Sequence, residues 1–327
     1  MGKIVGIPKA LLYYNFYPMW KTFFEELGAE VITSCNTCKK IVDDGVKSCV
    51  DETCLPVKIF VGHVIDLKEK GVDYIFIPRV VSIEKRRYLC SKFLGLPDLV
   101  KNLVTNLPEI IDMKIDYYRG DDTMKKEILR VGKKFVNDSK KIYDAYLKSI
   151  EMQKKFESVM RRGLSNTEAI KAIEENSVDV KLNGNLKIAL LAHSYDIMDD
   201  YICMGIIDRL RNMGANVFTT CMLDRDKIEL GASKLQKDLF WTYGRDILGA
   251  GKYFIENRDI DGVISVSAFG CGPDSLTDDL LERDYKRDGK IPYMSLTIDE
   301  HTGEAGITTR LEAFIDLLRW RKGEITI

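Results

Sequence analysis

The 327-residue chain has no run of about 20 apolar residues, the length that a helix needs to cross a bilayer. It also has almost no excess charge, because 49 Lys and Arg residues nearly balance 50 Asp and Glu residues. Surfaces that bind nucleic acid or anionic membranes need an excess of basic residues. The first residues predict a strand with no apolar signal segment behind it. We therefore expect a cytoplasmic chain without membrane or nucleic-acid partners.

The chain also lacks a recognisable nucleotide-binding loop. The stretch Gly249-Ala250-Gly251-Lys252 does not have the spacing Gly-x4-Gly-Lys, and Tyr253 stands where a phosphate loop has Ser or Thr. No Gly-x-Gly-x-x-Gly follows a predicted strand. We expect that the chain neither binds nor hydrolyses ATP through such a loop.

An internal repeat predicts the fold. Both halves contain the order strand, helix, strand, helix, strand, which is typical of parallel sheets with right-handed crossovers. The matching strand segments are residues 3–7 and 187–191, residues 27–35 and 213–221, and residues 73–77 and 261–265.

The repeat predicts an α/β protein with two Rossmann-like parallel-sheet domains that arose by internal duplication. We expect an N-terminal domain over residues 1–118, a helical insertion over residues 119–184 and a C-terminal domain over residues 185–327. In the insertion, an apolar stripe at helical spacing and a capping box from Ser165 to Glu168 indicate helices that serve packing.

Eight cysteines in a chain expected to be cytoplasmic do not predict a disulfide framework. Taken one at a time, each is at least as well explained as a small buried hydrophobic residue. Cys203 fits that interpretation best, because it falls inside the helical pattern of residues 201–213.

Cys271 stands at the end of a predicted strand. The apolar run of residues 262–266 predicts a buried strand, and Pro273 suits the first turn of a helix. The free N–H groups and dipole at a helix start favour a thiolate, as a metal ligand or nucleophile requires. Cys54 likewise precedes Pro56 by two residues, and Cys90 follows the strand predicted at residues 73–78.

Ligands of parallel α/β sheets gather beyond the carboxyl ends of the strands. Cys35, Cys90, Cys221 and Cys271 all follow predicted strands closely. We therefore expect both halves to present cysteines to one shared site.

Three kinds of site remain open. A zinc site could use Cys35, Cys38, Cys49 and Cys54, and a hydrolase could pair Cys271 with His301. An iron–sulfur cluster would use Cys54, Cys90 and Cys271 together, and three cysteines would leave one iron open to water or substrate.

A polar run over residues 297–306 follows the last predicted strand. Glu300, His301 and Glu304 are candidates for proton supply, with His63 a weaker one. The same run is equally compatible with a capped helix start that carries solvated charges.

The chain resembles the superfamily of 2-hydroxyacyl-CoA dehydratases and benzoyl-CoA reductases, and within it the domain found with acyl-CoA dehydratase activases, here as a free-standing chain. The resemblance runs nearly end to end. It rests on residues 6–11, 44–46, 54–58, 62–63, 74–79, 90–97, 269–275 and 299–306.

The resemblance implies two Rossmann-like domains with an iron–sulfur cluster between them. The positions that match the dehydratase ligands are Cys54, Cys90 and Cys271. It also implies an ATP-hydrolysing activase as electron donor, an anaerobic setting, a small-molecule substrate and a homodimer. A [4Fe-4S] cluster is expected, and extra cysteines, Cys35 and Cys221 among them, also allow the double-cubane [8Fe-9S] cluster of some relatives. The chain is short for a dehydratase subunit, and no coenzyme A pocket is recognisable, so an acyl-CoA substrate does not follow.

Two functions fit these expectations. One is a reductase or dehydratase-like enzyme that acts on a small substrate. The other is a non-catalytic partner that relays electrons or clusters to a larger enzyme.

Overall fold

The computed structural model describes residues 2–119, 121–180 and 183–324. Their contacts divide into two compact units. Unit 1 runs to Ser158 and also includes Phe240–Thr242, and unit 2 comprises Val159–Leu239 and the chain from Tyr243 onward. The division into residues 1–118, 119–184 and 185–327 stays a prediction about folding domains.

Unit 1 is built on a four-stranded parallel sheet in the order β2-β1-β3-β5. Its strands are β1 (Ile4–Ile7), β2 (Glu30–Thr33), β3 (Tyr74–Phe76) and β5 (Glu109–Ile111). A separate parallel pair is formed by β4 (Arg79–Ser82) and β6 (Lys114–Asp116).

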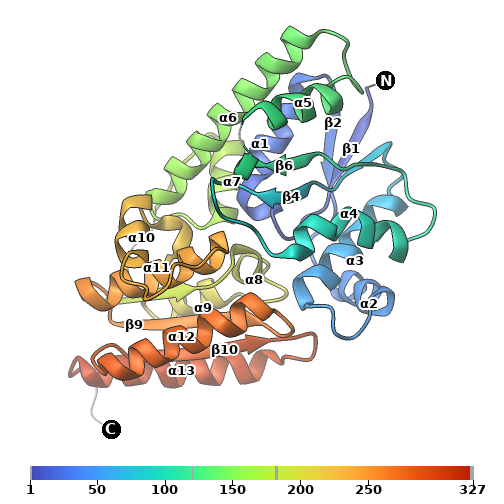
Figure 1. Ribbon diagram of the computed structural model, residues 1–327. Coiled ribbons are helices and arrows are strands. Elements are labelled where there is room, and N and C mark those ends of the chain that lie inside the picture. Colours follow the sequence, from blue (N-terminus) through green and yellow to red (C-terminus); the bar gives the residue numbers. More distant parts are fainter. Residues whose placement is uncertain (1, 120, 181–182, 325–327) are drawn as a thin grey trace. The chain divides into compact units, whose positions relative to one another are not determined.

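Helices cover both faces of the unit 1 sheet (Figure 1). On one face, Trp20 and Phe24 each pack edge-on against Phe76 with ring centroids 5.1 Å apart. On the other face, a Cβ added to Gly6 of β1 would lie 2.9 Å from the side chain of Leu67. The helix that contains Leu67 therefore packs directly against β1. The helices are α1 (Tyr13–Glu26), α2 (Lys39–Ser48), α3 (Leu55–Glu69), α4 (Ser91–Leu103), α5 (Asp121–Gly132) and α6 (Ser139–Arg161), with a 3-10 turn at Tyr117–Arg119.

Unit 2 repeats the connectivity of unit 1. Its parallel sheet has the order β10-β9-β7-β8, which is β8-β7-β9-β10 when followed from the other edge. The strands are β7 (Leu186–Leu191), β8 (Ala215–Thr219), β9 (Gly262–Ala268) and β10 (Tyr293–Ile298). The predicted α/β class with two parallel sheets of duplicated connectivity is therefore confirmed.

The unit 2 sheet is likewise covered on both faces. Phe254 and Leu281 pack with Val263 in one buried cluster, whereas a Cβ on Gly262 would meet Phe314 and Leu318 on the opposite face. The helices are α7 (Asn166–Glu174), α8 (Ser194–Ile197), α9 (Ile206–Asn212), α10 (Arg225–Ala232), α11 (Thr242–Asn257), α12 (Gly272–Asp288) and α13 (Glu304–Arg321), with a 3-10 turn at Thr220–Met222.

Two local predictions in unit 2 are confirmed and one helix boundary is wrong. The capping box from Ser165 to Glu168 is present, and Cys203 is buried. The helix expected over residues 201–213 begins at Ile206 instead, because Met204 and Gly205 both take positive φ angles, 53° and 63°, that an α-helix does not allow.

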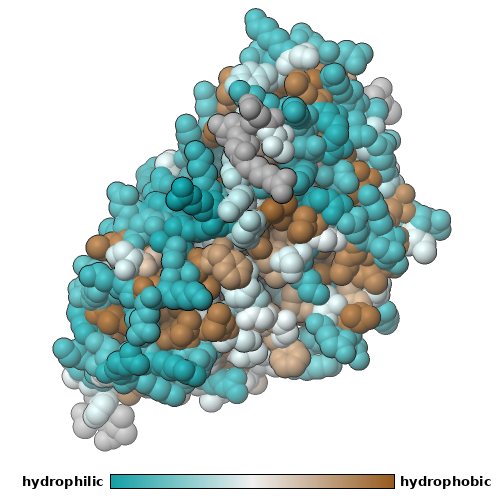
Figure 2. Space-filling view, viewed as in Figure 1, coloured by the Kyte–Doolittle hydropathy of each residue, from teal (hydrophilic) through white to brown (hydrophobic). Residues whose placement is uncertain are grey.

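The surface agrees with the balanced composition. Hydrophilic side chains dominate the face seen in Figure 2, with apolar residues in small groups between them. Within the described part of the chain, every helix is too short or too polar to cross a bilayer.

Candidate metal centre

The three cysteines predicted as cluster ligands occupy the same kind of position. Cys54, Cys90 and Cys271 are the N-cap residues of α3, α4 and α12. Pro56 and Pro273 lie in the first turns of their helices, as predicted. Each cysteine therefore precedes a helix turn whose backbone N–H groups have no intrahelical acceptor, although within the described chain none of the three side chains forms a cap hydrogen bond.

Cys90 and Cys271 also hold equivalent places in the two units. Cys90 begins α4, which follows β3 and the short strand β4 and leads to β5, and Cys271 begins α12, which connects β9 to β10. In a parallel sheet these helix starts lie at the carboxyl ends of the strands, where ligands bind. The duplicated topology thus places one cysteine at the same edge of each sheet.

In unit 1, positive charge accompanies the cysteines. Burial raises the pKa of the Cys49 thiol, and the charges of Lys58 and Lys92 partly offset that rise. Lys58 belongs to the helix that Cys54 caps, and Lys92 belongs to the helix that Cys90 caps. Lys58 is also buried, at 4% exposure. Cations from both helix starts thus oppose the effect of burial on the Cys49 thiol without cancelling it.

Two glycines let α2 lie directly against α3 beside these cysteines. A Cβ on Gly45 would lie 2.0 Å from the carbonyl oxygen of Lys58, and a Cβ on Gly62 would lie 2.0 Å from that of Ile41. Close crossing at these glycines fixes the end of α2, where Cys49 is the C-cap, against α3.

Two further cysteines of unit 1, Cys35 and Cys38, lie between β2 and α2. Cys35 follows β2 and is exposed, and its backbone N–H donates to Oδ2 of Asp66 at 2.9 Å. Burial and then the carboxylate of Asp66 raise the pKa of the Cys35 thiol. Cys38 is the N-cap of α2. None of the eight cysteines forms a disulfide within the described chain.

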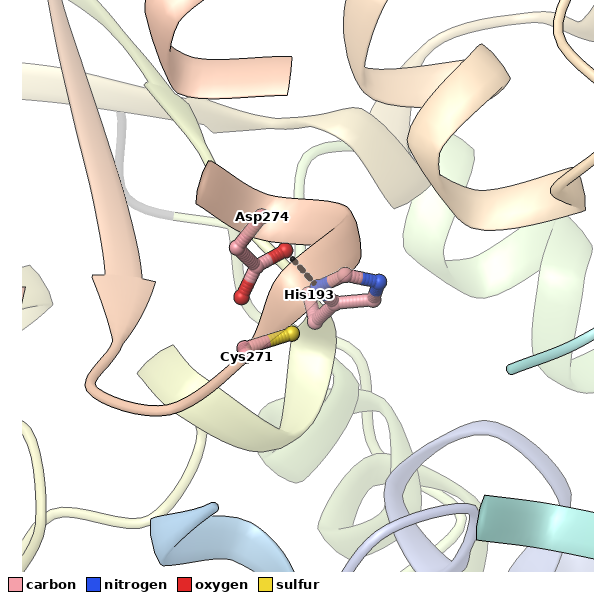
Figure 3. Close-up of side chains that lie close together, drawn as sticks. All are labelled: His193, Cys271 and Asp274. Atoms are coloured by element: carbon pink, nitrogen blue, oxygen red, sulfur yellow. Dashed lines mark ion pairs between the residues drawn. The ribbon is translucent and has the colours of Figure 1, made fainter. Parts of the chain in front are cut away.

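Unit 2 contains a buried cluster that includes Cys271. A ring nitrogen of His193, the sulfur of Cys271 and a carboxylate oxygen of Asp274 all lie within 4.8 Å of one another. Figure 3 shows the three side chains converging at the start of α12. Nδ1 of His193 lies 2.5 Å from Oδ1 of Asp274, and both side chains are at most 5% exposed. The ring of His193 stacks on Tyr195 at 4.9 Å.

Asp196 adds a second carboxyl group to this cluster. It is fully buried, and its Oδ2 lies 3.8 Å from Nδ1 of His193. Burial raises the pKa of Asp196 well above its ordinary value, and the nearby charge of Asp274 raises it further. The side chains of Asp196 and Cys271 each hydrogen-bond to Asp274. Apart from these contacts, neither oxygen of Asp196 and not Oδ2 of Asp274 has a hydrogen-bond partner among the described residues.

These carboxyl groups reverse one prediction. The helix start was expected to favour the thiolate of Cys271, but burial raises the pKa of this thiol, and Asp274 and then Asp196 contribute to the rise. The dipole contributes about half a positive charge at most, and two nearby carboxyl groups outweigh it. Without a cation, Cys271 is a thiol.

Cys221 lies beside the same cluster. It stands in the 3-10 turn after β8, and its sulfur is 3.2 Å from the hydroxyl of Ser194, the residue that follows His193. The amide nitrogen of Asn166 lies 3.8 Å from the sulfur.

The predicted proton donors form a separate feature at the start of α13. His301 and Glu304 are exposed, and Glu304 forms an ion pair with Arg209. Oδ1 of Asp299 accepts from the backbone N–H of His301 at 2.9 Å and from Thr302. This is a capped turn with solvated charges, and the proposed proton supply by Glu300, His301 and Glu304 stays a prediction.

His63 does not resemble a proton donor. It is fully buried in α3, and burial lowers its pKa to about 3. Its Nε2 lies 2.9 Å from the hydroxyl of Thr37. His63 is therefore a neutral core residue that ties the segment before α2 to α3.

Sequence reasoning missed His193, Asp196 and Asp274. A signal for His193 was present, because it is one of only three histidines and comes two residues after β7. Cys54 and Cys90 belong to unit 1, and Cys221 and Cys271 belong to unit 2. A cluster shared by both units therefore stays a prediction.

The chain is similar to known proteins at two levels. A family model described as "CoA enzyme activase uncharacterised domain" matches residues 4–223, a range that holds Cys54 and Cys90 but not Cys271. A search of curated proteins gave no match.

Two solved structures align over most of the chain. One is an ABC transporter periplasmic solute-binding protein from Actinobacillus succinogenes 130z with bound D-allose, at 12% identity over 100% of this chain and 93% of that chain, with a TM-score of 0.21. The other is an ABC transporter solute-binding protein from Agrobacterium vitis bound to alpha-D-tagatopyranose, at 13% identity over 90% of this chain and 76% of that chain, with a TM-score of 0.20. TM-scores this low do not establish a common fold.

Proposed function

Because the chain belongs to the family of the CoA enzyme activase uncharacterised domain, we propose that it is an iron–sulfur protein that receives electrons from an ATP-hydrolysing activase. The activase would supply the ATP-dependent step, and this chain would supply the metal centre.

One observation carries this proposal. Cys54, Cys90 and Cys271 are all N-cap residues of helices, and two of them hold equivalent places in duplicated units. A random set of core cysteines would not share that position. Iron–sulfur clusters take thiolates from separate loops, and N–H groups near the sulfurs tune their potential.

The donor set suits such a cluster chemically. The three cysteines are half-buried, so their sulfurs are neither sealed in the core nor fully solvated. Lys58 and Lys92, which belong to the helices that Cys54 and Cys90 begin, bring positive charge to Cys49. When bound, a [4Fe-4S] cluster would supply one-electron chemistry and one iron without a cysteine ligand.

The remaining roles follow from the positions of the side chains. We assign Cys54, Cys90 and Cys271 as iron ligands. Cys35 and Cys221 are further candidates because they follow the second strand of each unit, and they would serve if the centre is a double-cubane [8Fe-9S] cluster. Glu300, His301 and Glu304 would supply protons from the loop after β10.

We propose reductive or dehydratase-like chemistry on a small substrate, carried out by a homodimer in the cytoplasm. A non-catalytic electron or cluster carrier is the second candidate. Only an enzyme should show a substrate-dependent change in the spectrum of the reduced cluster.

Iron and sulfide analysis of protein purified without oxygen tests the proposal. Cys271→Ser should lose iron, and Cys203→Ser is the matched control, because Cys203 is buried in the core and should leave the iron content unchanged. A full complement of iron in Cys271→Ser would refute the ligand assignment.

A further inference from the structure

The buried cluster around His193 has properties that the iron–sulfur proposal does not require. It joins one imidazole, one thiol and two carboxyl groups from the ends of β7 and β9 and the helices that follow them. All of these groups except Cys271 are more than nine-tenths buried. The cluster lies wholly within unit 2.

The carboxyl groups of this cluster have no lysine or arginine partner in the described part of the chain. No described Lys or Arg forms an ion pair with Asp196 or Asp274, and His193 is the only basic partner of either carboxyl group within the described chain. Outside the contacts among Asp196, Asp274 and Cys271 themselves, three oxygens of the two carboxyl groups have no hydrogen-bond partner among the described residues. Buried acceptors without donors are costly, and a bound cation would satisfy them together.

The chemical types of the possible ligand atoms indicate which metal ion the cluster would bind. Imidazole nitrogen and thiolate sulfur with carboxylate oxygen suit Zn²⁺ or Fe²⁺, whereas Mg²⁺ and Ca²⁺ prefer oxygen alone. The three closest ligand atoms already lie within 4.8 Å of one another, so small side-chain rotations would complete a first coordination sphere. Asp196 can supply a fourth ligand or orient His193.

We propose that unit 2 by itself binds one divalent transition-metal ion through His193, Cys271 and Asp274, with Asp196 beside them. The thiol proton of Cys271 leaves to solvent as the Cys271–metal bond forms. Because Cys271 is also an assigned cluster ligand, the ion occupies the cluster-free protein and the two centres exclude each other. The mononuclear site is thus a state that precedes cluster assembly or follows cluster loss.

Cobalt is a suitable probe, because Co²⁺ in a tetrahedral zinc site gives visible absorption bands and a thiolate-to-metal band in the near ultraviolet. Full-length protein, stripped of metal and kept free of oxygen, should bind one Co²⁺ per chain and show both features. Mg²⁺ should not displace it. Wild-type protein without the thiolate band would overturn the proposal.

Variants separate this site from the iron–sulfur centre. His193→Ala and Asp274→Asn should weaken Co²⁺ binding by about 10- to 100-fold or more. The control variant His301→Ala removes an exposed histidine that follows β10, and it should bind Co²⁺ as tightly as wild-type protein does. Cys54→Ser/Cys90→Ser should lose the iron–sulfur centre and keep the cobalt spectrum, whereas Cys271→Ser should lose both.

These outcomes distinguish the two proposals. Equal Co²⁺ affinity in His193→Ala and wild type would overturn the mononuclear site without touching the iron–sulfur proposal. If a variant does not fold, X-ray absorption at the cobalt edge of wild-type protein decides, because the proposal requires one sulfur and two or more nitrogen or oxygen neighbours. A shell of oxygen atoms alone would overturn it.

Discussion

His193 and Asp274 meet at 2.5 Å inside unit 2, although one follows β7 and the other belongs to the first turn of α12. Their contact joins the carboxyl ends of two adjacent parallel strands. It also keeps Cys271 next to an imidazole, an arrangement that places nitrogen, sulfur and oxygen ligands around one point.

The first prediction concerns Asp196 in metal-free protein. Its pKa is raised on folding, so the folded state holds its proton more tightly than the unfolded state does. The stabilisation by Asp196 is fully present below the ordinary pKa of aspartic acid. It is lost as the pH rises toward the raised pKa of Asp196 in the folded state. Asp196→Asn should therefore remove part of the loss of stability between pH 4 and pH 8.

Urea unfolding at a series of pH values measures this effect. Asp279→Asn is the matched control, because Asp279 lies in an exposed i, i+4 ion pair with Arg283. An identical pH slope in Asp196→Asn and wild-type protein would show that Asp196 is already ionised in the folded state.

The second prediction has the opposite sign. Burial lowers the pKa of His63 to about 3, so the folded protein keeps His63 neutral while the unfolded chain binds a proton below about pH 6.5. The contribution of His63 to the free energy of unfolding is fully present above pH 6.5. It falls by up to about 1.4 kcal/mol for each pH unit below that.

His63→Gln should flatten the dependence of unfolding free energy on pH between 6.5 and 5. If His63→Gln retains the full acid sensitivity of the wild type, His63 is not held neutral in the core.

The third prediction concerns the crossing of α2 and α3. Gly45→Ala and Gly62→Ala each place a Cβ 2.0 Å from a backbone carbonyl oxygen, so the helices must separate. We expect each to lower the free energy of unfolding by more than about 2 kcal/mol.

Gly95→Ala supplies the control, because nothing lies within 4 Å of a Cβ at this helical position. It should raise the free energy of unfolding by about 0.5–1 kcal/mol. Equal effects at Gly45 and Gly95 in urea unfolding would contradict the close helix crossing.

The sequence predicted the positions of Cys54 and Cys271 because their signals are local: a proline two residues after each cysteine indicates a helix start, and Cys271 also follows a predicted strand. It did not predict that His193, Asp196 and Asp274 gather around Cys271, since that depends on how β7 and β9 align in the sheet. The pKa of Cys271 was predicted in the wrong direction because burial, the largest cause of the rise, and the carboxyl groups of Asp274 and Asp196 become visible only in the fold.

The sequence analysis also did not predict the shortest strands. The strands β4, β5 and β6 have only three or four residues each. Apolar and polar residues do alternate over residues 111–116, but so short a pattern was not used as a strand signal. The pairing of these short strands is decided by the strands beside them. The repeated order of the longer strands, in contrast, was visible in both halves of the sequence.

The most direct test of the central claim is the metal and sulfide content of full-length protein purified without oxygen. The account predicts a brown protein with about four or eight iron atoms per chain, together with acid-labile sulfide. A colourless protein that contains one zinc and no sulfide would contradict the iron–sulfur assignment.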